Sequence, residues 1–332
     1  MSELNNTNTL GNKIRIFCCG GAGIGIGKYF EPERGNRQAG YAELDPVYMD
    51  TSKASTFGVP SEHFYQLPEA NGSGGVRRYN GPDIVKYTGE MLQQFPLADV
   101  NIIIHSTTGG SGSVMGPSIA SEALAQGKTA IVFAVGGDDT KNYILNTIGT
   151  MESYEGIVET REKSVVVQYL QNGLDGTIEQ VDAKVHLAVS CLTVLFSGQN
   201  KNLDARDLIN VFHPENVTSF APQVGVLSIH REKLNLGSDA NLMTVATLNN
   251  DLNNTKLDRP VEFQRVGVPV HPDADKDMKF PLHFVVADGF LDSVMKNLRK
   301  QLADYETREG ARVVKNKLSN GNTKKTSNGL VF

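Results

Sequence analysis

The first half of the chain alternates short apolar runs with longer stretches of helical periodicity. The apolar runs predict buried strands at 13–19, 47–50, 100–105, 129–135 and 165–170. The periodic stretches predict helices at 82–95, 117–126 and 142–158. Strands that alternate with helices are typical of a doubly wound parallel sheet. We therefore predict an α/β domain over residues 1–176.

The pattern changes after residue 176. An apolar helical stretch at 178–196 lies within a predicted central helix, 177–200, and its apolar positions fall on nearly every face, so we expect it to be buried all round. Four strand-like runs then predict a smaller mixed α/β domain over 201–288, at 224–229, 242–248, 261–270 and 282–287. Residues 289–318 predict a long polar helix on the outside of that second domain, and the composition of 319–332 is typical of disorder.

Composition and charge narrow the class of protein. The chain has 332 residues, of which 39% are hydrophobic and 21% charged, and its net charge is −5. This balance fits a globular protein and gives no reason to expect binding to nucleic acid or to an anionic membrane. No run approaches the ~18 apolar residues of a membrane span, and the polar N-terminus lacks signal-peptide features, so we expect a cytoplasmic protein. Three cysteines, two of them adjacent, fit neither a zinc site nor a disulfide framework.

Two glycine-rich segments each follow a predicted strand. The first is 20–27 (G-G-A-G-I-G-I-G), and the second is 107–113 (T-T-G-G-S-G-S), which leads into a predicted helix. Glycines let backbone N–H groups converge on an anion, and a helix N-terminus adds its positive dipole end. Packing alone also produces such turns, but two of them at the carboxyl edge of one sheet favour a phosphate site.

Counting excludes two familiar nucleotide motifs. A dinucleotide fingerprint needs a third glycine where this chain has Ile26 or, in the other register, Lys28. A P-loop needs a glycine five positions before a Gly-Lys-Thr, and Glu122 occupies that position before 127–129. The glycine segments therefore belong to another class of nucleotide site.

The second glycine segment resembles the tubulin/FtsZ signature G-G-G-T-G-S-G, with Thr108 and Val114 in place of its outer glycines. The first resembles the opening phosphate loop of the same family, and the replacements are most similar to those of divergent phage and plasmid tubulins. The resemblance implies a tubulin/FtsZ-like fold that binds GTP or GDP with Mg²⁺, the metal being held mainly by the phosphates. It also implies a head-to-tail homopolymer that positions phage DNA or capsids in the host cytoplasm.

The stretch 202–207 (N-L-D-A-R-D) resembles the catalytic N-x-D-x-x-D of FtsZ-like proteins. Asp204 and Asp207 are three apart at the start of a predicted helix, where helix capping is the alternative role. The helix 178–196 spans roughly 28 Å, so a nucleotide at its start is out of their reach. We therefore predict that Asp204 and Asp207, with Asn202, act on the nucleotide of a neighbouring subunit, which makes the protein an assembly-coupled GTPase.

The resemblance implies further contacts with the nucleotide. Asp182 lies twenty positions before Asn202, the family's spacing for a guanine-binding residue, and Asn172 resembles a second guanine contact; a helix cap and a turn are the alternatives. The resemblance leaves open which of Asp138 and Asp139 contacts the ribose. The full set of predicted GTP-binding residues is Gly20, Gly21, Ala22, Gly23, Asp50, Thr51, Gly74, Gly75, Thr108, Gly109, Gly110, Ser111, Gly112, Ser113, Asp138, Asp139, Asn172 and Asp182.

Several of these contacts have their own competing interpretations. Gly74 and Gly75 match a γ-phosphate-sensing loop in position, with a flexible turn as the alternative, and Asp50 and Thr51 are candidates to approach Mg²⁺ or phosphate. Ile24 stands where the family commonly has an asparagine that touches the base. The last residues are basic, whereas some phage tubulins carry an acidic tail.

Two other functions compete with the GTPase. A nicotinamide-dependent oxidoreductase would use the first glycine segment and Asp50, but the glycine spacing argues against it. A nucleotide-binding scaffold that does not hydrolyse its ligand would need neither Asp204 nor Asp207.

Overall fold

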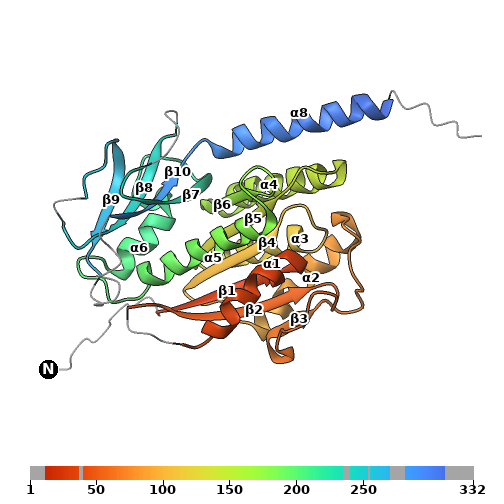
Figure 1. Ribbon diagram of the computed structural model, residues 1–332, viewed down its shortest axis with the longest axis horizontal. Coiled ribbons are helices and arrows are strands. Elements are labelled where there is room, and N and C mark those ends of the chain that lie inside the picture. Colours follow the sequence, from red (N-terminus) through yellow and green to blue (C-terminus); the bar gives the residue numbers. More distant parts are fainter. Residues whose placement is uncertain (1–11, 37–39, 235–239, 253–254, 270–280, 311–332) are drawn as a thin grey trace, which may run out of the picture.

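A ten-stranded sheet runs through the molecule (Figure 1), in the order β3-β2-β1-β4-β5-β6-β7-β10-β8-β9. The computed structural model describes residues 12–36, 40–234, 240–252, 255–269 and 281–310. The strands are β1 (Lys13–Cys19), β2 (Glu43–Asp50), β3 (Phe64–Gln66), β4 (Val100–Ser106), β5 (Thr129–Gly136), β6 (Val165–Gln171), β7 (Val224–Arg231), β8 (Leu242–Leu248), β9 (Val261–Gly267) and β10 (Leu282–Ala287).

The first six strands are parallel to their neighbours, as predicted. Strand β7 joins this sheet because Val165 of β6 pairs in parallel with Val224. Strand β10 is antiparallel to both β7 and β8, and β8 pairs in parallel with β9. The second half is therefore mixed, and it continues the sheet of the first half.

Helices cover both faces of the sheet. They are α1 (Gly20–Gly27), α2 (Arg77–Gln94), α3 (Gly112–Ala125), α4 (Lys141–Arg161), α5 (Ile178–Leu195), α6 (Ala205–Phe212) and α8 (Phe290–Gly310). One core holds Ile14 and Ile16 of β1 with side chains of α1, α5 and α6. The other holds Phe17 of β1 with α2, α3, α4 and α8. Alternate residues of one strand thus face two helical layers, which confirms the predicted doubly wound arrangement.

Residues 20–27 form a helix, α1, where the sequence predicts a loop. Glycine has low helix propensity, so tertiary packing must stabilise this helix. A Cβ atom on Gly23 would overlap the carbonyl oxygen of Ile104, and one on Gly27 would overlap the Cys18 sulfur. The glycines therefore let α1 lie directly against β1 and β4, which no larger side chain would allow.

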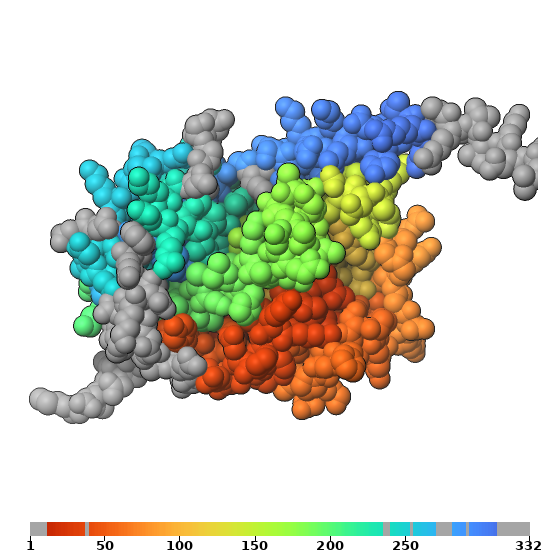
Figure 2. Space-filling model, viewed as in Figure 1, coloured from red at the N-terminus to blue at the C-terminus, as the bar shows by residue number. Residues whose placement is uncertain are grey.

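The central helix α5 is not buried all round, contrary to our expectation. Val181, Val185 and Leu192 are buried, but Ile178 and Leu187 are 61% and 65% exposed. The reason is that α5 packs on one face of the sheet and has no covering layer on its other side. Its outer side forms part of the molecular surface on the face shown in Figure 2 (green).

Helix α8 packs on the first half of the chain, so the prediction that it covers the second domain is wrong. Met295 and Leu298 are buried in the core that contains α4, and Lys141 of α4 forms an ion pair with Glu309 at 2.6 Å. Figure 1 shows α8 extending from β10 across α4. The rest of the predicted helix and the predicted tail, 311–332, lie outside the described residues. None of the described helices is long and apolar enough to span a membrane.

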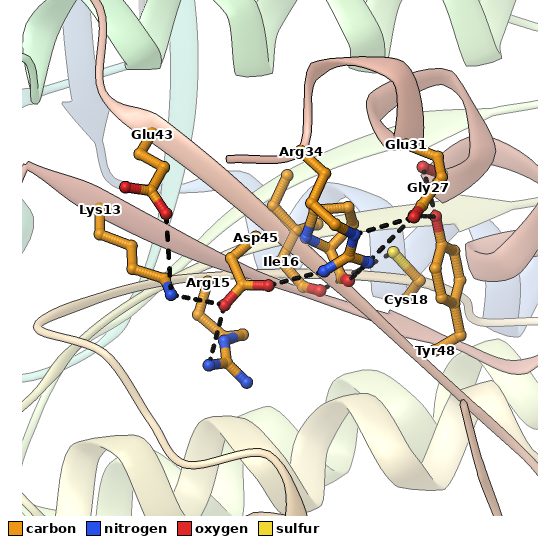
Figure 3. Close-up of polar contacts among 11 residues, drawn as sticks. Lys13, Arg15, Ile16, Cys18, Gly27, Glu31, Arg34, Glu43, Asp45 and Tyr48 are labelled. Carbon is orange, nitrogen blue, oxygen red and sulfur yellow. Dashed lines mark hydrogen bonds and ion pairs between the residues drawn. The ribbon is translucent and has the colours of Figure 1, made fainter. Parts of the chain in front are cut away.

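An ion-pair network holds the segment after α1 against the edge of the sheet (Figure 3). The Asp45 carboxylate of β2 accepts from Lys13 at 2.7 Å, Arg15 at 3.0 Å and Arg34 at 2.7 Å. Arg34 also pairs with Glu31 at 2.8 Å. Burial alone would raise the pKa of Asp45, but the Lys13 hydrogen bond and the three cations outweigh it, so the pKa lies below its usual range.

Candidate functional site

The two glycine segments meet at the carboxyl ends of β1 and β4, which are neighbours in the sheet. Helix α1 begins at Gly20, whose φ is +71°, and α3 begins at Gly112. A Cβ atom on Gly20 would lie 2.8 Å from the Gly112 nitrogen. Two helix N-termini, each with unpaired N–H groups and a positive dipole end, therefore lie side by side at one sheet edge. Such an arrangement can bind an anion.

Three predicted segments meet through a cluster of buried hydroxyl groups. The Thr51 and Ser111 oxygens are 2.7 Å apart, Ser73 and Ser111 are 3.0 Å apart, and Thr51 and Ser73 are 3.3 Å apart. Asp50 accepts from the Thr51 backbone N–H at 2.7 Å. Burial raises the pKa of Asp50, although hydrogen bonds from Thr51 and Ser111 partly offset it. Sequence reasoning missed Ser73, which lies between the glycines of G-S-G-G.

Gly109 and Gly110 occupy different surroundings. A Cβ atom on Gly109 would meet nothing within 4 Å, whereas one on Gly110 would lie 2.5 Å from the Ser73 Cβ and 2.8 Å from the Val76 nitrogen. Gly110 therefore packs the second glycine segment against residues 72–76. Gly109 is the position from which this segment faces open space.

Other predicted phosphate contacts differ in exposure. Gly21 and Ala22 are exposed in the first turn of α1, while Gly23 is buried against β4. Ser113 is fully buried inside α3, and its hydroxyl has no hydrogen-bond partner among the described residues. Backbone N–H groups near Gly21 are thus better placed to meet a ligand than any group of Gly23.

Two asparagines of α4 hold the segments 72–76 and 106–113. Asn142 donates to the Gly75 carbonyl at 2.5 Å. Asn146 donates to the same carbonyl at 2.8 Å and to the Thr108 carbonyl at 2.7 Å. Sequence reasoning missed both residues, and their spacing of four at the start of a helix was the available signal.

The two candidates for the ribose contact are distinguished by helix α8. Asp138 accepts a hydrogen bond from Gln301 at 2.7 Å, and the Asp139 backbone carbonyl accepts one from Tyr305 at 3.1 Å. Within the described part of the chain, no hydrogen bond or ion pair reaches the Asp139 carboxylate. The side chain of Asp139 is therefore the one available to a ligand.

Asp182 and Asn172 lie near the same edge, at the start of α5 and the end of β6. Thr177 and Gln180 form the capping box of α5, so the capping alternative for Asp182 is wrong. Burial raises the pKa of Asp182, and nearby Glu179 raises it further. The side-chain oxygen of Asn172 is buried, and no described residue donates to it. Both side chains retain unused hydrogen-bond acceptors.

The predicted catalytic residues lie at the far end of α5, beside α6 (Figure 1). The Asp204 carboxylate caps α6 by accepting from the Asp207 backbone N–H at 2.8 Å, and the Asp207 carboxylate accepts from the Asp204 backbone N–H. The capping role is therefore present. Asp207 also accepts from Arg265 of β9 at 2.6 Å, a partner that sequence reasoning missed. Asn202 has a φ of +62° in the preceding turn. Helix α5, with 18 residues, is about 27 Å long, and it separates this cluster from the sheet edge where the glycine segments lie.

The described residues contain no group of three or more histidine, cysteine or acidic side chains arranged to hold a metal. Asp50 and the hydroxyls beside it nevertheless supply oxygen atoms, the ligands that Mg²⁺ prefers. A site in which phosphates provide most of the ligands fits this donor set.

Proteins similar to this chain in sequence include tubulin-like proteins of bacteriophages. No protein-family model matches the chain. A phage tubulin-like protein of Pseudomonas phage PhiPA3 is 26% identical over 323 residues, which cover 96% of the chain and 98% of the relative. Another, from Pseudomonas phage phiKZ, is 25% identical over 336 residues with the same coverage.

Solved structures give the same assignment for the fold. A protofilament of TubZ from bacteriophage PhiKZ has a TM-score of 0.84 and 23% identity, covering 96% of this chain and 99% of that one. The phage tubulin PhuZ with GDP has a TM-score of 0.82 and 21% identity, covering 97% and 99%. The predicted fold class is confirmed. The chain has the tubulin-like fold of these structures, and over nearly its whole length its sequence is similar to the phage tubulin-like proteins.

Proposed function

We propose that this chain is a filament-forming GTPase whose active site is completed by the next subunit in a head-to-tail polymer. The observation that carries the proposal is the separation of two half-sites. Paired helix N-termini and buried hydroxyls lie toward one end of α5, and the Asp204 and Asp207 carboxylates lie beyond its other end; the helix between them is about 27 Å long. Two such half-sites can act together only when one subunit stacks on another.

The phosphates of GTP would bind at the N-termini of α1 and α3. Backbone N–H groups near Gly21 and Gly109 are the donors, and the two helix dipoles favour the negative charge. Mg²⁺ would be held by phosphate oxygens with Asp50 and Thr51 nearby, and when bound it neutralises charge on the phosphates. A cation there would also favour the ionised form of Asp50, whose pKa burial raises.

The base and sugar would lie along the start of α5. The Asp182 carboxylate can accept from guanine N1–H and the exocyclic amine, a pair of donors that adenine does not offer. The Asn172 amide supplies a second contact through an oxygen that no described residue uses. Asp139 is our choice for the ribose, since Asp138 already accepts from Gln301.

Hydrolysis would take place at the contact between subunits. Asp204 is exposed and uses one carboxylate oxygen for the cap, so the other can orient a water against the γ-phosphate of the neighbour. The water oxygen forms a bond to phosphorus, the bond to the GDP oxygen breaks, and the water proton passes to the carboxylate. The Arg265 Nε atom lies 2.6 Å from an Asp207 carboxylate oxygen, so this ion pair holds Asp207 beside Asp204.

The cellular role would be to position phage DNA or capsids in the cytoplasm of the infected host. Support for it comes from the family resemblance and from the phage origin of the similar proteins. Neither the similar proteins nor the spacing of the glycines favours a nicotinamide-dependent oxidoreductase. The scaffold that binds nucleotide without hydrolysis differs from our proposal in one measurable product, inorganic phosphate.

The test is assembly and turnover of the purified chain with GTP, GDP, ATP or NAD⁺. We expect light scattering and pelleting with GTP, and phosphate release that rises more steeply than linearly with protein concentration because two subunits build each site. Asp182→Ala should weaken GTP binding about 10- to 100-fold, the contribution of hydrogen bonds to a charged group. Glu179→Ala, one turn earlier on α5, is the matched control and should bind normally.

Three results would contradict parts of the proposal. Equal affinity of the wild type for GTP and ATP would reject the guanine assignment. Phosphate release proportional to protein concentration throughout would reject the shared site. Assembly without any phosphate release would favour the scaffold.

A further inference from the structure

Helix α4 presents one polar face to the two segments that we assign to the phosphates. The residues on this face are spaced at helical intervals and are Asn142, Asn146, Thr147, Thr150 and Ser153. Each makes a hydrogen bond outside its own helix, and the partners lie in residues 72–77 or 106–113. The helix is thus a common support for two segments that are about thirty residues apart in sequence.

Asn146 joins a backbone carbonyl of each segment through one group, its side-chain amide. Its side-chain nitrogen lies 2.8 Å from the Gly75 carbonyl oxygen and 2.7 Å from the Thr108 carbonyl oxygen. Both partners are acceptors, so the amide must present its NH₂ group, and both of its hydrogens are used. The residue is only 5% exposed, so water cannot readily replace these bonds.

Two neighbours of Asn146, Asn142 and Thr147, each hold one segment only. Asn142 donates to the Gly75 carbonyl and makes no bond to residues 106–113. Thr147 bonds to the Thr107 hydroxyl at 2.9 Å and makes none to residues 72–76. These two residues therefore provide variants that test each attachment separately.

The segment 72–76 needs such a support because its own backbone is permissive. Gly74 and Gly75 have φ angles of +54° and +71°, in the region where glycine has a freedom that other residues lack. A Cβ atom on Gly74 would meet nothing within 4 Å. The second glycine segment is different, since it is held between β4 and α3 and packed by Gly110 and Gly112.

We propose that Asn146 is a positioning residue that fixes segment 72–76 over segment 106–113 and thereby sets the preference for nucleoside triphosphate over diphosphate. The inference rests on the proposed nucleotide site. The family resemblance implies that Gly74 and Gly75 sense the γ-phosphate, so segment 72–76 would reach the terminal phosphate. Segment 106–113, which leads into the N-terminus of α3, would then serve the inner phosphates. Loss of Asn146 loosens the permissive segment more than the constrained one, so triphosphate binding should suffer more.

The experiment measures GTP and GDP affinity of monomers for the wild type, Asn146→Ala, Asn146→Asp, Asn142→Ala and Thr147→Val. For both Asn146 variants we expect GTP affinity to fall about tenfold and GDP affinity by less than about threefold. Asn142→Ala should shift the ratio in the same direction by a smaller factor. Thr147→Val should leave the ratio unchanged, because it touches only the segment that serves both nucleotides.

Thermal melts identify any variant that fails to fold. If the Asn146 variants do not fold, Asn142→Ala, at a partly exposed position, tests whether the support of segment 72–76 sets the GTP-to-GDP ratio. An unchanged GTP-to-GDP ratio in folded Asn146 and Asn142 variants would overturn the inference while leaving the nucleotide site intact. A ratio shifted equally by Thr147→Val would also overturn it, since any damage to α4 would then have the same effect. A wild type that binds neither nucleotide would instead reject the proposed function itself.

Discussion

Asp204→Asn should separate the charge of this residue from its role in folding. Asp204 is the N-cap of α6 and accepts from the Asp207 N–H at 2.8 Å. Asparagine caps helices about as well as aspartate, so the variant should keep its stability within a few tenths of a kcal/mol. Asp204→Ala loses the cap and should cost about 1 kcal/mol, a fall in Tm of roughly 2 °C for a chain of this size.

Both variants should lose hydrolysis to a similar extent. An amide or a methyl group cannot accept the proton of an attacking water, and positioned general bases typically contribute about 10²- to 10⁴-fold. Asp204 and the subunit's own glycine segments lie at opposite ends of α5, a helix about 27 Å long, so GTP binding by the monomer should not change. Filaments should therefore form with GTP and persist, because the nucleotide is not consumed.

The assay pairs phosphate release with pelleting, and a mixing experiment sharpens it. A subunit blocked for nucleotide by Gly109→Val keeps Asp204, so it can supply the carboxylate to an Asp204→Asn subunit that holds GTP. Some phosphate release should return on mixing, provided that pelleting shows the two subunits in the same filaments. Full turnover by Asp204→Asn would refute the shared site. A defect confined to Asp204→Ala would assign the residue to capping alone.

Three further variants test the site and the fold. Gly109→Val should fold normally and lose nucleotide affinity, because its Cβ meets no atom within 4 Å; Gly110→Val should instead unfold, since its Cβ would lie 2.5 Å from that of Ser73. Wild-type affinity in a folded Gly109→Val would show that the segment is only a turn. Asp45→Asn should cost about 2 kcal/mol at pH 7 by leaving Arg34 and its neighbouring cations without their shared carboxylate. The pKa of Asp45 is lowered in the folded state, so its stabilisation is present above the unfolded pKa of about 4 and is lost as the pH falls through the folded value. The stability gap between wild type and variant in denaturant melts should thus close on acidification, and a gap independent of pH would contradict the assignment.

Strands were the easiest elements to predict from the sequence. The run 100–105 is mostly apolar because helices cover β4 on both faces. A strand buried on both faces is therefore recognisable from its apolar residues alone. Strand β3 was missed because it has only three residues, of which one, Tyr65, is buried. Helix α1 was missed because its glycines oppose helix formation locally, and the contacts that stabilise it come from β1 and β4.

Periodicity predicts that a helix has an apolar side but not which surface receives it. Met295 and Leu298 mark such a side on α8, yet the sequence does not say that α4 covers it. The same holds for α5, whose exposed Ile178 and Leu187 suggest full burial when the helix is considered alone. Partner choice depends on the path of the chain between elements, and that path leaves no periodic pattern.

Some residues of the candidate site could be predicted from the sequence, and others could not. Glycine segments and the paired carboxylates could be found because their chemistry requires those residue types at fixed spacings. Asn146, Ser73 and Arg265 were missed because each acts through contacts with groups distant in sequence. The spacing of Asn142 and Asn146 indicates a shared helix face, but it does not say which backbone carbonyls those side chains meet.

The arrangement of the two half-sites also constrains when hydrolysis can occur. The sheet is continuous from β3 to β9, and both ends of α5 pack on it. Thermal motion of one subunit therefore cannot bring Asp204 along the length of α5, about 27 Å, to its own glycine segments. A monomer would then hold GTP without consuming it, and each stacking event would complete one site. Such a contact joins unlike surfaces of identical chains, so each added subunit presents the same open surface to the next. Filament growth and the onset of hydrolysis are in this scheme the same physical event.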